Sequence, residues 1–237
     1  MNRPQLRLVA RIYEVFNRTD HGPEQLWPPI AAVLAILALQ LSLAERFTVG
    51  PNWFVPTLEA LLLIPFTIAA FRKTAKEAAP VRIFNVLLIA VVVAFNLASL
   101  ILLIEALVGG KVTDGVVLLE NALKLWITNV IGFGMWYWEM DRGGPSRRRM
   151  EVKRREDFLF PQMSNPDFSQ LGWVPDFWDY LYVSFTNATA FSPTDTMPLT
   201  GRAKMLMTVE KDLIVSLHSV KTGFQGNYGS HMAAVHP

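Results

Sequence analysis

The chain has 237 residues, of which 51% are apolar and 18% are charged. The charged share is below the roughly 25% of soluble domains, and the net charge of +2 gives no reason to expect a nucleic-acid partner. The chain has no cysteines, which excludes disulfides, thiolate metal sites and cysteine nucleophiles. Because the apolar residues are clustered in long runs, these totals indicate a membrane protein.

Residues 1–25 precede the first apolar run and are charged but periodic. Apolar side chains fall on one helical face and charged side chains on the other; the apolar set is Leu6, Val9, Ile12, Tyr13 and Phe16. The pattern predicts a cytoplasmic amphipathic helix. Such a helix lies either in the membrane interface, with its arginines near anionic head groups, or on the cytoplasmic side of the protein itself.

Four apolar stretches follow within residues 26–139. They are 26–44, 53–71, 83–108 and 116–138. Each is near the roughly 20 residues that a helix needs to cross a ~30 Å hydrocarbon core. The sequence therefore predicts an all-α fold, a polytopic transmembrane helical bundle with four spans. Trp136, Tyr137 and Trp138 are predicted to form an aromatic belt at the membrane interface.

Basic residues are concentrated in alternate loops between these stretches. They are frequent before the first stretch, between the second and third, and after the fourth, whereas the two other loops hold only Arg46 and Lys111. Lysine and arginine mark cytoplasmic loops. The pattern predicts a multi-pass protein of a cytoplasmic (inner) membrane with a cytoplasmic N-terminus.

Residues 140–175 are predicted to form a basic cytoplasmic loop. Its Gly143-Gly144-Pro145 run should end the fourth helix. Basic residues after this run can contact anionic lipid or a protein partner, or can serve only as a topology signal. They are Arg147, Arg148, Arg149, Lys153, Arg154 and Arg155.

Residues 176–217 have the order of a pore hairpin. Phe177–Phe191 is a short apolar helix of roughly 15 residues, too short for a full crossing. Ser184 and Asn187 lie on a polar stripe beside its apolar face. A hydroxyl-rich turn and Asp195-Thr196-Met197-Pro198 come next, and a second helix begins after them.

Three motifs carry a resemblance to a known family. They are the run from Trp136 to Pro145, Asp157-Phe158-Leu159-Phe160-Pro161, and the block from Asp176 to Met207. In these the chain resembles an uncharacterised family of bacterial multi-pass membrane proteins with no established activity. The block also distantly resembles the pore hairpin of the cation-channel superfamily, where Asp-x-x-Pro follows the selectivity filter.

The filter positions themselves depart from those of potassium channels. Aligned through Asp195 and Pro198, they are Ala190-Phe191-Ser192-Pro193-Thr194. Potassium filters use glycines so that successive carbonyls can point at the ion, and Pro193 fixes its own φ and has no N–H. We therefore expect a degenerate pore-like hairpin without potassium selectivity. The loop charges place its entry on the cytoplasmic side, unless the basic loop itself is crossed.

The second arm of the hairpin, Ala203–Leu217, carries Glu210, Lys211 and Asp212 together. Each charge costs about 2.5–3.5 kcal/mol at mid-membrane, so this arm is not expected to span by itself. Residues 218–237 form a polar C-terminal tail. Its Gly229-Ser230-His231-Met232 run resembles a cloning remnant, so the sequence leaves both a native and a non-native origin for the tail.

Polar residues inside apolar helices are candidates for a transport path because they are costly to bury in lipid. The candidates are Glu59, Glu120, Lys124, Ser184, Asn187, Thr189 and Asp195. Glu120 and Lys124, at i and i+4, can instead be a self-satisfied structural pair. Asn96, Asn121 and Asn129 are predicted to hydrogen-bond between helices. No cofactor and no metal site is expected, because no ligand-like spacing is present.

Two functions are compatible with these features. The first is a channel- or transporter-like protein with the hairpin at its centre, which functions alone or as a homo-oligomer in the lipid bilayer. The second is a structural or regulatory membrane protein that uses its basic loop to bind lipid or a partner. An enzyme is not expected, because the sequence has no nucleophile–base pair, H-E-x-x-H motif or phosphate loop.

Overall fold

The computed structural model describes residues 27–48, 50–51, 53–57, 60–61, 78–109, 115–148, 155–164, 173–189 and 195–211. The described chain is mostly helical, which confirms the all-α class. The longer helices are α2 (Trp27–Leu41), α4 (Ala78–Val108), α5 (Gly115–Met140) and α8 (Phe177–Thr189). Short elements are η1 (Glu45–Phe47), η3 (Asp141–Gly143), α6 (Pro145–Arg148), α7 (Pro161–Ser164), β1 (Phe158–Leu159) and β2 (Met197–Pro198). Residues 201–211 are also helical.

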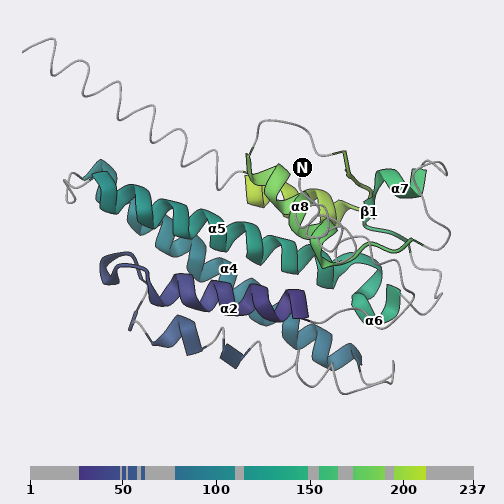
Figure 1. Cartoon of the computed structure of the whole chain (residues 1–237), viewed down its shortest axis with the longest axis horizontal. Coiled ribbons are helices and arrows are strands. Elements are labelled where there is room, and N and C mark those ends of the chain that lie inside the picture. The colour runs from purple at the N-terminus through teal and green to yellow at the C-terminus, as the bar shows by residue number, and fades with distance from the viewer. Residues whose placement is uncertain are drawn as a thin grey trace, which may run out of the picture.

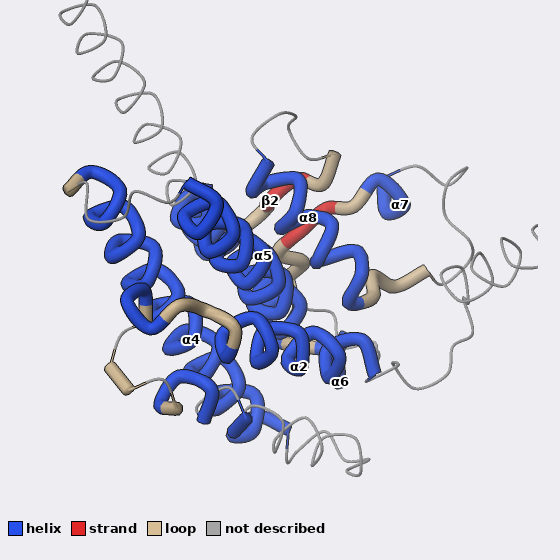
Figure 2. The backbone as a smooth tube through the Cα atoms, turned by 60° about the vertical axis from the view of Figure 1, so that its left-hand side comes forward, coloured by secondary structure: helices blue, strands red, loops and turns tan. Residues whose placement is uncertain are grey.

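Helix α5 is the centre of the described structure. It contacts α4, α2 and α8, and Figure 2 shows α4 on one side of it and α8, β2 and α7 on the other. The larger apolar core includes Val33 of α2, Ile89 of α4, Phe133 of α5 and Val183 of α8, all almost fully buried. The core therefore joins the N-terminal helices to the C-terminal third of the chain.

Two described helices are long and apolar enough to cross a membrane. They cover Arg82–Leu107, within α4, and Gly115–Gly143, which continues α5. These match the predicted third and fourth spans. Helix α2 is apolar but has only 15 residues, about 22 Å at 1.5 Å per residue, which is less than the ~30 Å of a hydrocarbon core. The structure therefore supports two of the four predicted spans.

Other predicted segments fall wholly or partly outside the described residues. The N-terminal amphipathic helix lies outside them. The predicted second span, 53–71, is described only at 53–57 and 60–61, where residues 54–57 and 60–61 are helical. The second arm of the hairpin is described as far as residue 211.

Two glycines of α5 allow close packing on opposite sides. A Cβ atom on Gly132 would lie 3.1 Å from Cγ2 of Val93 in α4, and one on Gly134 would lie 3.0 Å from Cα of Leu181 in α8. The second contact is with backbone, which cannot turn aside as a side chain can. Small residues are used in this way where helices approach closely in membranes, so Gly134 sets the distance between α5 and α8.

Helix α5 ends where the sequence predicts. Gly143 and Gly144 have φ angles of 89° and 94°, a region that glycine adopts without steric cost. A Cβ on Gly144 would also lie 3.3 Å from a carboxylate oxygen of Glu139. The chain therefore turns sharply here and begins α6 at Pro145.

Helix α8 and the helix over residues 201–211 both start near the C-terminal end of α5. Leu181 of α8 packs on Gly134, and Phe185 packs on Trp126 further toward the start of α5. Helices α8 and α5 are therefore antiparallel (Figure 1). Strand β2 then pairs with β1, with Met197 opposite Leu159. The helix over residues 201–211 starts from this strand pair.

The predicted aromatic belt is wrong for two of its three residues. Tyr137 is fully buried and Trp138 is 1% exposed. Tyr137 contacts Phe158, with ring centroids 5.1 Å apart, and Trp138 contacts Phe177 at 6.0 Å. These rings hold the C-terminal third against α5 rather than facing the head groups.

We predict that Gly134→Ala will lower the free energy of unfolding by about 1–3 kcal/mol, the usual cost of overpacking a well-packed contact. The methyl group would have to displace the backbone of α8 at Leu181. Unfolding of the purified protein in detergent would measure the change. Gly115→Ala is the matched control, because a Cβ there meets nothing within 4 Å. Equal stability of the two variants would contradict the close approach of α5 and α8.

Candidate functional site

Two buried aspartates connect the end of α5 to the returning chain. Asp141 and Asp157 are both fully buried. The Asp141 carboxylate accepts the backbone N–H of Asp157 at 2.7 Å and the Tyr180 hydroxyl at 2.5 Å. Hydrogen bonds to a charged acceptor are roughly twice as strong as neutral ones, so Asp141 fixes both β1 and α8 at this end of α5.

Asp157 in turn holds the start of the helix over residues 201–211. Arg202 donates to it from Nε at 2.7 Å and from Nη2 at 2.6 Å, and the Thr200 hydroxyl donates at 2.5 Å. The Leu199 N–H donates to the Asp157 carbonyl at 2.8 Å. This bidentate hydrogen bonding raises the pKa of Arg202 above its usual value. The second entry point of the hairpin is therefore fixed beside the first.

Arg148 caps the C-terminal end of α5. Its Nη1 donates to the carbonyls of Trp138 at 2.5 Å and Asp141 at 3.2 Å, and the Asp141 carbonyl also accepts the Gly144 N–H at 2.9 Å. Its guanidinium lies 4.9 Å from the ring centroid of Tyr180. Arg148 is 7% exposed, and a cation at this position also interacts favourably with the helix dipole.

Asp176 and Asp179 cap the N-terminus of α8 reciprocally. The Asp176 N–H donates to the Asp179 carboxylate at 2.8 Å, and the Asp176 carboxylate accepts the N–H groups of Trp178 and Asp179 at 2.8 and 3.3 Å. This is the arrangement of a capping box. Burial and the neighbouring Asp176 carboxylate raise the pKa of Asp179 to about 7.

A second polar cluster surrounds Glu210, which is fully buried. Its Oε2 accepts the Tyr137 hydroxyl at 2.6 Å and the Asn187 amide at 2.5 Å, and its Oε1 lies in short hydrogen-bond contact with the Ser184 hydroxyl. Ser184 also lies 2.7 Å from the Val130 carbonyl. The cluster therefore joins α5, α8 and the helix over residues 201–211.

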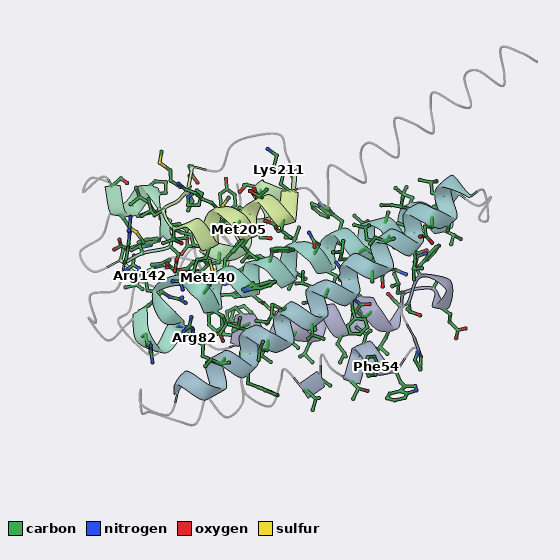
Figure 3. All side chains as sticks on the ribbon, turned by 180° about the vertical axis from the view of Figure 1, so that it is seen from behind. Phe54, Arg82, Met140, Arg142, Met205 and Lys211 are labelled. Atoms are coloured by element: carbon green, nitrogen blue, oxygen red, sulfur yellow. The ribbon has the colours of Figure 1, made fainter. Side chains whose placement is uncertain are left out.

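Burial raises the pKa of Glu210 to about 7, although the hydrogen bonds from Ser184, Tyr137 and Asn187 act in the opposite direction. A buried carboxylate without a counter-charge is costly and tends to bind a proton instead. The helix over residues 201–211 lies outside the two candidate spans. Its end is nevertheless packed against α5 through Glu210, whereas Met205 and Lys211 are exposed, with Lys211 at the outer edge of the molecule in Figure 3.

Among the candidate path residues, the structure brings Ser184 and Asn187 together. Thr189 makes a local hydrogen bond to the Thr186 carbonyl at 3.1 Å, and Asp195 is exposed. Neither of these reaches the Glu210 cluster. Glu59 lies outside the described residues.

Glu120 and Lys124 form the predicted ion pair at 2.6 Å. Lys124 also donates to the carbonyl of Ser42 at 2.8 Å, just beyond the end of α2. A lysine there satisfies a carbonyl at a helix C-terminus and interacts favourably with its dipole. The pair lies toward the start of α5, away from Ser184, so its geometry favours the structural interpretation.

Two of the three asparagines hydrogen-bond between segments. The Asn96 amide donates to the Leu125 carbonyl at 3.2 Å and so joins α4 to α5, as predicted. Asn121 accepts the N–H of Ala44 at 3.0 Å, which joins α5 to the segment after α2. The Nδ2 of Asn129 is buried and has no partner in the part of the chain that the structure describes.

The basic residues predicted to contact lipid or a partner occupy different positions. Arg155 is exposed and Arg147 is half-buried, whereas Arg148 is buried against α5. Arg149, Lys153 and Arg154 lie outside the described residues. Figure 3 shows Arg82 and Arg142 at one end of the bundle and Phe54 at the other.

The sequence analysis missed Tyr137 and Glu210 as members of a polar cluster. Glu210 was counted only as a charge that opposes burial. A usable signal was present, because Ala203, Met207 and Glu210 are spaced i, i+4 and i+7 and share one helix face. All three are buried. A carboxylate on the apolar face of a short helix indicates that buried side chains nearby form hydrogen bonds to it.

No group of described His, Asp or Glu residues is arranged to hold a metal ion. No family model, curated protein or solved structure matches the chain.

We predict that Arg202→Ala will lower the free energy of unfolding by about 1–3 kcal/mol, because it removes charge-assisted hydrogen bonds from the buried Asp157. Arg202→Lys should restore only part of this loss, since an ammonium cannot reproduce the bidentate contact. Thermal unfolding in detergent would measure both. Lys204→Ala, an exposed change two residues away, is the control. An Arg202→Ala protein as stable as the Lys204→Ala protein would contradict this role for Asp157.

Proposed function

We propose that the chain is a channel- or transporter-like integral membrane protein whose hairpin, residues 176–217, lies beside the path of the transported ion or solute. The motif resemblance to bacterial multi-pass membrane proteins and to cation-channel pore hairpins supports this proposal. The absence of filter glycines at residues 190–194 argues against potassium selectivity.

The observation that carries the proposal is that α8 and the helix over residues 201–211 both start near the same end of α5. Tyr180 near the start of α8 binds Asp141 at the end of α5. Arg202 near the start of the following helix binds Asp157, whose N–H donates to Asp141. The 13-residue helix α8 is about 20 Å long, too short to cross. Two helices that start at the same end of a bundle, the second directly after strand β2, resemble the arrangement of a pore hairpin.

The lipid-facing surface of the two candidate spans supports a membrane location. Large apolar side chains are exposed along both helices, where a bilayer would cover them. Examples are Ile83, Leu87 and Ile101 on α4, and Val116, Leu119 and Leu123 on α5. In the proposed arrangement the protein lies in a bacterial inner membrane with its N-terminus and the end of α5 on the cytoplasmic side, as the loop charges favour. A homo-oligomer would place several hairpins around one axis.

The proposed re-entrant course predicts which residues are accessible from each side of the membrane. Cysteines introduced at Ser164 and Met197, both exposed, should react with a membrane-impermeant maleimide from the same side. A cysteine at Gly109, between the two candidate spans, should react from the opposite side. The chain has no native cysteine to interfere. Labelling of Ser164 and Met197 positions from opposite faces would show that the hairpin crosses.

The proposed function predicts cation flux through liposomes that contain the purified protein. Asp195→Asn should change this flux at least several-fold, because Asp195 follows the return segment in the place of the channel aspartate. Glu105→Gln, a matched change at an exposed position of α4, should leave flux unchanged. A dye- or isotope-based assay against empty liposomes would measure it. Flux equal to that of empty liposomes would remove the proposal.

A further inference from the structure

The Ser184 hydroxyl has two acceptors and one proton. Its oxygen lies 2.7 Å from the Val130 carbonyl and in short contact with Oε1 of Glu210. A carbonyl can only accept a hydrogen bond, and a hydroxyl can donate one and accept others. If the serine donates to Val130, the hydrogen in the second contact must come from Glu210.

This arrangement satisfies every group in the cluster when Glu210 is a neutral acid. Oε1 then carries the proton and donates to Ser184, while Oε2 accepts from Tyr137 and Asn187. The amide of Asn187 also donates to the carbonyl of Met207 at 2.9 Å. When Glu210 is ionised, Ser184 must turn to it and the contact with Val130 loses its hydrogen.

The groups that face Glu210 provide no positive charge. Tyr137 is the titratable group that faces it from α5, and Ser184 and Asn187, which face it from α8, are uncharged. On its own helix, Lys211 is exposed. Among the described residues, no lysine or arginine forms an ion pair with Glu210. Burial, the largest cause, raises its pKa to about 7, and no cation among the described residues counteracts this rise.

We propose that Glu210 is a proton-binding site that controls how the helix over residues 201–211 packs against α5 and α8. On protonation, a proton from water binds Oε1 and the Ser184 proton turns toward the Val130 carbonyl. On deprotonation, the proton returns to water and Ser184 donates to the carboxylate. The proton is then the ion that the hairpin binds. Only the expected effect of this proton on flux rests on the proposed function.

Infrared spectroscopy of the detergent-purified protein tests protonation directly. A carboxylic-acid C=O stretching band, sensitive to H/D exchange, should be present at acid pH and disappear with a midpoint near pH 7. Glu210→Gln should remove this band from the difference spectrum. Glu105→Gln is the control, because Glu105 is exposed and its replacement should leave the band in place. Asp179 also titrates near this pH, so the difference between the wild type and Glu210→Gln isolates Glu210.

Ser184→Ala tests the hydrogen bond that the proton count requires. Loss of the acceptor should move the C=O band of Glu210 to higher frequency, as expected for an acid that donates no hydrogen bond. An unshifted band would overturn the proposed arrangement. This variant keeps Glu210 in place, so it remains informative if Glu210→Gln fails to fold.

Stability should depend on pH in the corresponding direction. A carboxyl group with a raised pKa contributes most below its unfolded pKa of 4.5, and the contribution falls as pH rises to about 7. Over that window the unfolding equilibrium constant of the wild type should rise roughly 100- to 1000-fold relative to Glu210→Gln. Parallel pH profiles of the two proteins would overturn the proposal.

The proposal and the proposed function fail separately. A titrating Glu210 band in a protein that gives no flux would leave the proton site intact and remove the transport role. Flux in a protein whose spectrum is unchanged by Glu210→Gln at every pH would support the transport role and rule out the proton site.

Discussion

The C-terminal third of the structure depends on two aspartates that are buried and fully hydrogen-bonded. Asp141 holds Tyr180 and the backbone of Asp157, and Asp157 holds Arg202 and Thr200. Each carboxylate accepts several donors, which is the condition under which a buried charge is tolerated. Together with the pairing of β2 with β1, this chain of contacts holds the start of the second helix of the hairpin beside the start of the first.

The two polar clusters differ in how they compensate a carboxylate. Asp157 has a bidentate arginine and is held by charge. Glu210 has hydroxyl and amide donors but no described cation, so the neutral acid fits it better. The Asp157 cluster therefore fixes the position of the hairpin, and the Glu210 cluster is suited to bind and release a proton as pH changes. Both clusters lie against the C-terminal half of α5. The aspartate cluster lies at its end, and the Glu210 cluster lies earlier, between Val130 and Tyr137.

The sequence predicted the helices well because length and apolar content determine them. The stretches at 83–108 and 116–138 became α4 and α5 with ends within a few residues, and Gly143-Gly144-Pro145 ended α5 as expected. The i, i+4, i+7 spacing of Ala203, Met207 and Glu210 indicates a buried carboxylate, but its pairing with Ser184, Asn187 and Tyr137 depends on how three helices pack, which local pattern does not determine. Tyr137 and Arg148 were assigned to membrane and cytoplasmic surfaces from local pattern alone. Tertiary packing buried both.

Gly132 and Gly134 are two residues apart in α5, so they face different neighbours, Val93 and Leu181. At each contact the neighbour occupies the space that a side chain on α5 would otherwise fill. A side chain can accommodate a small displacement by changing its rotamer, but a glycine has no side chain. Sliding of α8 along α5 would therefore bring the Leu181 backbone directly against the main chain of α5 at Gly134, whereas on the α4 side the Val93 side chain lies between the two backbones.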